Sequence, residues 1–260
     1  MVNLSLMDQT QSTKIFYSKE VSPIISGLQA GKANISCTAV GTLDDMIQVV
    51  PKYDYNKAFD TAAADPVVVL HSSGSTGAPK PITMCHGTFA YLDNDHNRPL
   101  TPGRRNQDFT VYDMEGKLFH IFPPFHLAGF VSTILGPIFG KVSIVLGPPG
   151  VPPTGQLVTD ILKHQKLKGL FVPPSVIEEM VQQPGSINSF KAFDWVSYAG
   201  GPLSQATGQL VSEVTTLCQF YGATEFIQLH ILLPEKEDWA YIEVSSLKLN
   251  FKLIIDLDKY

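Results

Sequence analysis

The residues best suited to chemistry lie between His71 and Pro81, directly after the apolar run 67–70. Gly74 and Gly77 allow the backbone to turn sharply and to approach a ligand closely. The segment also supplies four hydroxyl groups and one cation, on Ser72, Ser73, Ser75, Thr76 and Lys80. A donor-rich loop that ends in a lysine suits the anionic oxygens of a polyphosphate. We therefore predict a phosphate-binding loop that follows a buried strand.

Two other interpretations of this segment are possible. A Ser/Gly-rich stretch can be a solvated surface linker, but the lysine and prolines set tightly behind a strand argue against a linker. The common P-loop places Gly, Lys and Ser or Thr in direct succession. Here Ala78 and Pro79 separate Gly77 from Lys80. The spacing therefore disfavours an ordinary P-loop NTPase or kinase.

The elements that must position such a loop become regular after Leu118. Apolar, strand-like runs alternate with helical segments, and the strands are roughly 22 to 29 residues apart, a spacing typical of βαβ crossovers. We predict an α/β fold with a largely parallel sheet and flanking helices. The expected strands are 118–122, 142–146, 170–172, 195–199 and 217–221, and the expected helices are 128–139, 155–164, 175–183 and 204–216. For the third helix, Ser175 is the predicted N-cap, with Glu178 as its capping-box partner.

Turn-forming and polar residues follow four of the predicted strands, at 123–126, 173–175, 200–202 and 220–225. In open α/β sheets, ligands bind outside the carboxyl ends of the strands. We therefore expect these turns to surround one cleft. The phosphate loop also leaves a strand at its carboxyl end, and we expect it to share that edge.

Two of these turns carry chemistry of their own. In the turn after 217–219, Gly222 permits a tight bend, Thr224 offers a hydroxyl to a phosphate, and Glu225 offers a hard oxygen ligand to Mg²⁺. In the turn after 195–199, Gly200 and Gly201 allow flat contact between the backbone and a base. Taken alone, each could equally be an ordinary strand-to-helix turn, one with an acidic first-turn residue and one preceding Ser204.

Together these segments resemble the adenylate-forming, or AMP-binding, enzyme superfamily. Pro81 after the lysine and His71 ahead of the serines are similar to the adenylation domains of fungal carboxylate reductases related to nonribosomal peptide synthetases (NRPS). The resemblance implies ATP and Mg²⁺ as cofactors, and Lys80, Thr224 and Glu225 as catalytic residues. It places Thr76 and Glu225 at the metal. It assigns the nucleotide to Ser72, Ser73, Gly74, Ser75, Thr76, Gly77, Lys80, Ala199, Gly200, Gly201, Tyr221, Gly222 and Thr224.

The segment 122–129 resembles the family motif that borders the acyl pocket, with Phe125 and His126 as its pocket residues. A single histidine in an apolar stretch can equally be a core residue, so both interpretations of His126 remain open. Pairing His120 with His126 as metal ligands is disfavoured, because no third ligand lies at a usable spacing.

The resemblance runs from about Thr13 to Trp239. It implies a partial adenylation domain over residues 1–239, part of the large N-terminal domain of the adenylate-forming fold, and a divergent tail over 240–260. The family's ribose-binding aspartate motif and its mobile C-terminal domain with the catalytic lysine find no match. We expect a fragment that activates a carboxylic acid as an acyl-adenylate in an NRPS-like system of secondary metabolism. The alternative is an inactive remnant that at most binds a nucleotide or a partner protein.

Composition limits the class of partner. The chain has 260 residues, of which 44% are hydrophobic and 17% charged, as in a well-packed globular protein. A net charge of −5 argues against nucleic acid or an anionic membrane surface. The three cysteines and the lack of a long apolar run favour a reduced, cytoplasmic chain. The expected partners are a small carboxylic acid and a carrier-protein or reductase module on another chain.

Overall fold

A computed structural model of the chain describes residues 2–31, 34–48, 51–72, 79–97, 99–100, 102–107 and 116–244. The chain divides into two compact units, Met1–Ala90 and Tyr91–Tyr260. The tail residues 245–260 and the loop residues 73–78 lie outside the described part of the chain.

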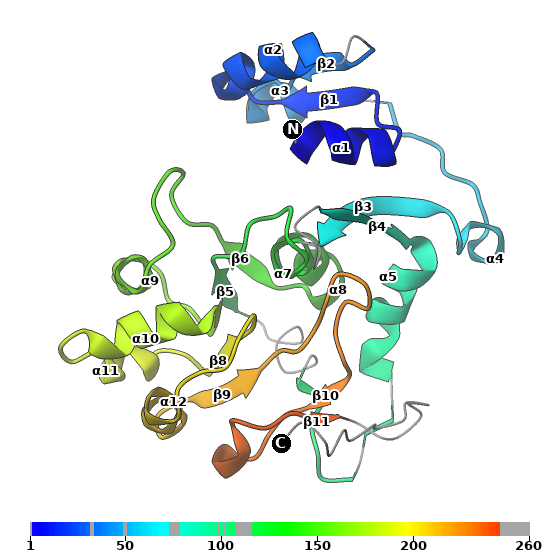
Figure 1. Cartoon of the computed structure of the whole chain (residues 1–260). Helices are drawn as coiled ribbons and strands as arrows, with labels where there is room; N and C mark the ends of the chain where they lie inside the picture. Colours follow the sequence, from blue (N-terminus) through cyan, green and yellow to red (C-terminus); the bar gives the residue numbers. More distant parts are fainter. Residues whose placement is uncertain are drawn as a thin grey trace, which may run out of the picture. The chain divides into compact units, whose positions relative to one another are not determined.

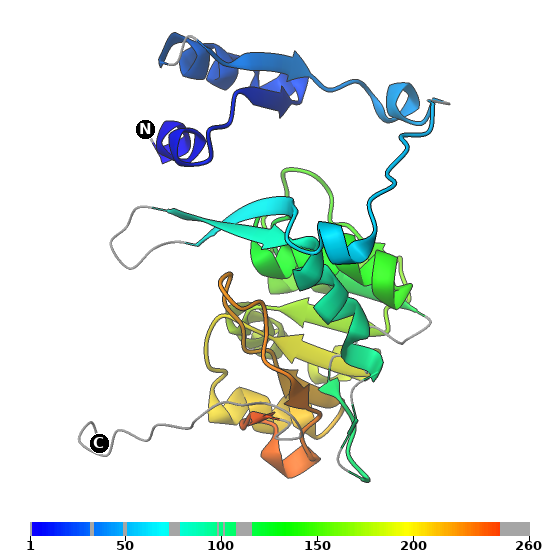
Figure 2. The ribbon, with the colours of Figure 1, turned by 90° about the vertical axis from the view of Figure 1, so that its right-hand side faces the viewer.

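The first unit contains two separate two-stranded sheets. In one, β1 (Lys14–Tyr17) and β2 (Ser36–Ala39) run parallel. In the other, β3 (Pro66–Ser72) and β4 (Lys80–Cys85) form an antiparallel pair, drawn in cyan in Figure 2. The helices of this unit are α1 (Val2–Gln9), η1 (Lys19–Val21), α2 (Ser22–Gly31), α3 (Leu43–Met46), α4 (Phe59–Ala62) and α5 (His86–Asp93), which continues past Ala90.

The strand before the phosphate loop is present, but it is not buried as the sequence suggested. In β3, Leu70 is buried, whereas Val67 and Val69 keep 46% and 43% of their surface exposed. In the described part of the chain β3 pairs with β4 in a two-stranded sheet, and no packed layer covers the face that carries Val67 and Val69. A run of valines favours a strand in either setting. The run therefore predicts the strand itself but not what covers its two faces.

The second unit is built on a five-stranded sheet in the order β6-β5-β7-β8-β9, with every pair parallel. This confirms the predicted α/β class. The chain moves from β5 outward to β6 and then returns to the other side of β5 at β7, so the strand order reverses between β5 and β7. The strands are β5 (Lys117–His120), β6 (Ser143–Val145), β7 (Gly169–Val172), β8 (Trp195–Tyr198) and β9 (Thr216–Gln219).

Helices lie against both faces of this sheet (Figure 1). The elements between the strands are α7 (Leu127–Phe130), η3 (Val131–Leu135), α8 (Gly136–Gly140), α9 (Gly155–Leu162), α10 (Pro174–Gln182), α11 (Ile187–Phe190) and α12 (Gln205–Ser212). The remaining elements of the unit are η2 (Asn94–Asn97), β10 (Ile231–Leu232), η4 (Lys236–Asp238) and β11 (Glu243–Val244).

Alternation along the strands divides the apolar side chains between the two faces. On one face, Phe119, Val172 and Tyr198 join a core cluster with α9, α10 and α12. On the other face, Leu118 and Phe171 join a smaller cluster that includes Ala128 of α7 and, beyond the strand ends, Phe122, Ala199 and Phe220. The second cluster therefore reaches the carboxyl edge of the sheet.

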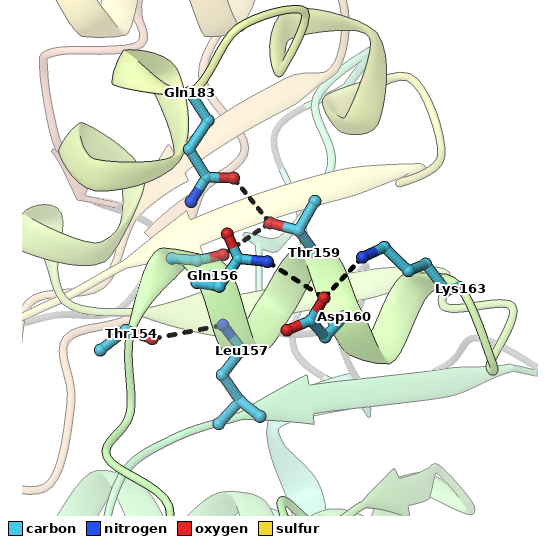
Figure 3. Close-up of polar contacts among 8 residues, drawn as sticks. Thr154, Gln156, Leu157, Thr159, Asp160, Lys163 and Gln183 are labelled. Atoms are coloured by element: carbon cyan, nitrogen blue, oxygen red, sulfur yellow. Dashed lines mark hydrogen bonds and ion pairs between the residues drawn. The ribbon is translucent and has the colours of Figure 1, made fainter.

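Local sequence determines where α9 begins and how it joins α10 (Figure 3). The hydroxyl of Thr154, the N-cap, accepts a hydrogen bond from the Leu157 N–H at 3.2 Å. Inside the helix, the Asp160 carboxylate accepts from Gln156 and from Lys163. Thr159 donates its hydroxyl proton to the Gln183 side chain at 2.9 Å, which ties α9 to the end of α10.

Two helix predictions need correction. The N-cap of α10 is Pro173, not Ser175, because Pro174 at the first helical position has a φ already suited to a helix. The segment 128–139 is helical throughout but is not one regular α-helix. Its middle is the π-helical turn η3, and Pro137, which has no N–H, follows in the first turn of α8.

Candidate functional site

A cavity of about 210 Å³ lies at the carboxyl edge of the five-stranded sheet. It is lined by residues that follow β5, β8 and β9, together with Phe171 in β7 and residues at the start of α7. The cavity thus includes the place where the strand order reverses, which is where open α/β sheets bind ligands. Three of the turns that the sequence singled out, those after β5, β8 and β9, contribute to this one cavity.

Four aromatic rings form a connected series along the cavity wall. The rings of Phe122 and Phe171 lie 4.6 Å apart between centroids, and those of Phe171 and Phe220 lie 5.1 Å apart. The imidazole of His126 stacks on Phe122 at 6.2 Å with an interplanar angle of 20°. This wall offers an apolar surface and ring edges to a planar group.

His126 is exposed and lines the cavity, so it is not a core histidine. It is also the N-cap of α7, where its Nδ1 accepts a hydrogen bond from the Ala128 N–H at 3.3 Å. A neutral imidazole that accepts at Nδ1 carries its proton on Nε2. The cap therefore leaves Nε2–H as a hydrogen-bond donor, suited to a carboxylate or phosphate oxygen.

The β9 loop (Phe220–Leu229) is closed by its own backbone. The Leu229 N–H donates to the Tyr221 carbonyl at 3.1 Å, and the Ile227 N–H donates to the Ala223 carbonyl at 2.7 Å. A Cβ added to Gly222 would lie 2.0 Å from the Ile227 carbonyl oxygen, so only glycine fits there. Ile227 has a φ of 65°, a strained conformation for a β-branched residue. The strained residue itself lines the cavity.

Within this loop, not all of the predicted ligand-binding residues line the cavity. Thr224 is half-buried and lines the cavity, as do Tyr221 and Gly222. Tyr221 stacks on Phe226 with a centroid distance of 6.3 Å. Glu225 is exposed and does not line the cavity. Thr224 and Gln228 therefore both bring polar side chains of the loop to the wall, while the Glu225 carboxylate faces a more open environment.

The β8 loop (Ala199–Ser204) forms another part of the wall. Ala199 and Gly200 line the cavity, whereas Gly201 does not. Gly200 has a φ of 94°, a conformation that side-chain-bearing residues rarely adopt. At the end of the loop, Ser204 caps α12 by accepting a hydrogen bond from the Thr207 N–H. Backbone atoms, not long side chains, therefore contribute this surface.

Buried polar contacts join the ends of β8 and β9 below the cavity. The Tyr198 hydroxyl donates to the Gln219 side-chain oxygen at 3.4 Å, and burial raises the pKa of Tyr198 to about 12. The buried Gln107 donates to the Gln219 carbonyl at 2.9 Å. Neither Gln107 nor Gln219 can be identified from the sequence, because no local motif marks a polar residue that supports a site formed by distant parts of the chain.

The remaining predicted site residues lie in the first unit, outside the cavity in the second unit, or in undescribed segments. Ser72 and Lys80 are register partners across the β3–β4 pair, so the hairpin places them opposite each other. Phe125 keeps 65% of its surface exposed and does not line the cavity, where Phe122 of the same motif does. The residues Ser73, Gly74, Ser75, Thr76 and Gly77 lie outside the described part of the chain.

Comparison with known proteins identifies the family. The family model for AMP-binding enzymes matches residues 7–250. A carboxylic acid reductase of Neurospora crassa is 35% identical over 178 residues, which are 67% of this chain and 17% of that protein. An isocyanide synthase–NRPS hybrid of Aspergillus fumigatus is 29% identical over 92% of this chain and 16% of its own length. The chain therefore spans about a sixth of the length of these two relatives.

Solved structures share the fold. A luciferase-like enzyme from the mealworm Zophobas morio aligns with a TM-score of 0.70 and 18% identity, covering 91% of this chain and 54% of that one. ATP-bound MatB from Rhodopseudomonas palustris aligns with a TM-score of 0.67 and 16% identity, covering 88% and 44%. In the described part of the chain, no helix is long and apolar enough to cross a membrane.

Proposed function

This chain belongs to the AMP-binding enzyme family, and on that premise we propose that it activates a carboxylic acid with ATP as an acyl-adenylate. One observation carries the proposal. The segments that resemble the family's adenine, α-phosphate and acyl motifs, which are far apart in the sequence, all line one cavity at the carboxyl edge of the sheet. A binding site assembled from several strand ends is typical of an α/β enzyme.

In the proposed reaction, a carboxylate oxygen of the acid attacks the α-phosphorus of ATP. A new oxygen–phosphorus bond forms, and the bond to pyrophosphate breaks, with pyrophosphate leaving with the electron pair. Such transfers depend mostly on positioning and charge stabilisation. Groups on rigid strand ends are well suited to that task.

Different residues would bind the different parts of the two substrates. The backbone of Ala199 and Gly200 and the ring of Tyr221 would contact the adenine, and the Thr224 hydroxyl would donate to the α-phosphate. The Nε2–H of His126 would orient the carboxylate beside the aromatic wall. The family resemblance assigns the distal phosphates to Lys80 and to the preceding Ser/Gly segment.

We also propose Mg²⁺ as a cofactor. The exposed carboxylate of Glu225, next in sequence to Thr224, is a hard oxygen that would suit the ion, and the family resemblance adds Thr76 as a ligand. When bound, the ion would neutralise charge on the phosphates.

The relatives support a finer proposal about the product. One is a carboxylic acid reductase and another is an NRPS hybrid. We propose that the acyl group formed here passes to a carrier-protein or reductase module, as part of an NRPS-like system of secondary metabolism. We further propose that residues 1–239 form the adenylation part and residues 240–260 a divergent segment.

The test measures the exchange of labelled pyrophosphate into ATP in the presence of candidate substrates, namely aromatic, aliphatic and amino acids. We expect Thr224→Ala to lower exchange by roughly hundredfold to thousandfold, the range for removing one donor to a developing charge. Thr216→Ala is the matched control, because Thr216 is an exposed threonine at the opposite end of β9. Lys80→Ala should weaken ATP binding by about 1.5–3 kcal/mol.

The outcomes separate turnover from binding. Exchange that depends on Thr224 but not on Thr216 supports acyl-adenylate formation. ATP binding measured by calorimetry, with no exchange for any acid, would reduce the function to nucleotide binding. Folded protein that neither binds ATP nor exchanges pyrophosphate would refute the proposal.

A further inference from the structure

Two adjacent carboxylates on α10 reach toward two different helices. Glu178 accepts hydrogen bonds from the Ser204 N–H at 3.1 Å and from the Thr207 hydroxyl at 2.6 Å. Its neighbour Glu179 accepts from the Gly155 N–H at 2.7 Å. Glu178 therefore acts on the start of α12, and Glu179 acts on the start of α9.

The two helix starts differ in what precedes them. The residues before Ser204 form the β8 loop, whose Ala199 and Gly200 line the cavity. The residues before Gly155 do not line it. Glu178 thus binds the last residue of a backbone segment that lines the cavity. Glu179 binds the end of a segment that does not line it.

The middle of the β8 loop has little packing around it. A Cβ added at Gly200 or at Gly201 would meet no atom within 4 Å. At one end the loop continues from β8, and at the other end Leu203 is buried in the core. Apolar packing holds a side chain in place but does not orient a peptide group. A hydrogen bond from the backbone to a carboxylate does orient it.

We propose that Glu178 is a positioning residue that holds the β8 loop in the conformation that receives the adenine of a nucleotide. The restraint on the loop stands on the hydrogen bonds alone, whereas its effect on a ligand rests on the proposed function. No family motif quoted above includes Glu178, and the sequence predicted for it only a capping role within its own helix.

Electrostatics support this arrangement. The hydrogen bond from the Thr207 hydroxyl is the largest influence that lowers the pKa of Glu178, and the bonds from Ser204 add to it. The carboxylate is therefore ionised at neutral pH, and both of its hydrogen bonds are charge-assisted, the stronger class.

The first experiment compares four variants of the full chain in their affinity for AMP, measured by calorimetry. We expect Glu178→Ala to weaken AMP binding by about fivefold to tenfold, as positioning residues without ligand contact do. Glu178→Gln keeps an acceptor for the Ser204 N–H and should stay within about threefold of the wild type. Glu179→Ala, the matched control, should leave AMP affinity unchanged. Thr207→Val removes only the hydroxyl donor, and its affinity for AMP should lie between those of Glu178→Ala and Glu178→Gln. This variant still tests the inference if Glu178→Ala does not fold.

The second experiment observes the loop without ligand, through the glycine amide signals of ¹⁵N-labelled protein. We expect the Gly200 and Gly201 signals to shift and broaden in Glu178→Ala and to stay unchanged in Glu179→Ala. The Gly201 signal is assigned by its loss in Gly201→Ala. This measurement needs no nucleotide, so it distinguishes a failure of the positioning role from a failure of the proposed function.

The results decide the inference as follows. If the wild type does not bind AMP, the glycine signals alone decide whether Glu178 restrains the loop, and pyrophosphate exchange decides the proposed function separately. The inference is overturned if Glu178→Ala and Thr207→Val leave both AMP affinity and the glycine signals unchanged. It is also overturned if Glu179→Ala changes them as much as Glu178→Ala does, because Glu178 would then contribute only general stability.

Discussion

The β8 loop and the β9 loop line the same cavity, but they are held in different ways. The β9 loop is closed by hydrogen bonds between its own backbone groups, and Gly222 has no room for a side chain. The β8 loop has open space at Gly200 and Gly201 and donates its Ser204 N–H to the carboxylate of Glu178 on another helix. The first loop is thus specified by its own residues, whereas the second depends on how α10 packs against α12.

The difference predicts where each loop is sensitive. A loop closed by close backbone contacts should not tolerate added volume. A loop anchored from outside should tolerate volume in its open middle but should respond to loss of its anchor. Three substitutions test this contrast and the sheet on which both loops rest.

The largest effect is expected from Gly222→Ala. Its Cβ would lie 2.0 Å from the Ile227 carbonyl oxygen, so the backbone of the β9 loop must move. We expect a loss of about 3 kcal/mol in the free energy of unfolding, at the upper end for overpacking. Urea denaturation measures it. Gly201→Ala is the matched control and should change stability by no more than about 0.5 kcal/mol. Equal losses from the two variants would contradict the contrast between the loops.

The next largest effect is a loss of stability at low pH, caused by His120 in the sheet that carries both loops. His120, at the end of β5, is buried, and its Nε2 lies 3.0 Å from the Thr133 hydroxyl. Within the described part of the chain its Nδ1 has no hydrogen-bond partner. Burial lowers the pKa of His120 from 6.5 to about 4, so the folded protein resists the protonation that the unfolded chain accepts. Stability should therefore fall as the pH drops from about 6.5 toward 4.

Between pH 7 and pH 5 the expected loss from His120 is about 2 kcal/mol in the free energy of unfolding. Urea denaturation at several pH values measures the loss. His120→Gln lacks the titrating group and should remove most of this slope, even if it lowers stability at every pH. A slope that is unchanged in the variant would show that other groups cause the acid sensitivity.

The smallest effect is expected from Tyr198→Phe. The Tyr198 hydroxyl donates to Gln219 at 3.4 Å, a long hydrogen bond between the strands that lead into the two loops. Losing it should cost about 0.5 kcal/mol, at the low end for a single hydrogen bond. Thermal unfolding measures the change. Tyr221→Phe is the control, because its side chain is largely exposed. A loss well above 1 kcal/mol would mean that the two strand ends act as one unit and would weaken the contrast between the loops.

Much of the second unit could be predicted because its signals are local. The apolar runs between turns predicted the five strands of the sheet to within a few residues of β5, β6, β7, β8 and β9. The turn residues after those strands included His126, Ala199, Gly200, Tyr221, Gly222 and Thr224, all of which line the cavity. The predictions were wrong where contacts with residues distant in the chain determine whether a side chain is buried. Val67 and Val69 form a strand as expected, yet β3 lies in a two-stranded sheet that leaves them exposed.

The sequence by itself determined the parallel α/β class and the family, because strand–helix alternation and short strand-end motifs are properties of contiguous residues. The tertiary structure alone decided which residues complete the cavity wall. Phe171 has the sequence pattern of a core residue, and Ile227 lines the wall in a backbone conformation of positive φ that no local pattern predicts. Likewise, Glu178 supports the β8 loop only because α10 packs beside α12. Contacts between residues distant in the chain depend on packing, and no local pattern encodes them.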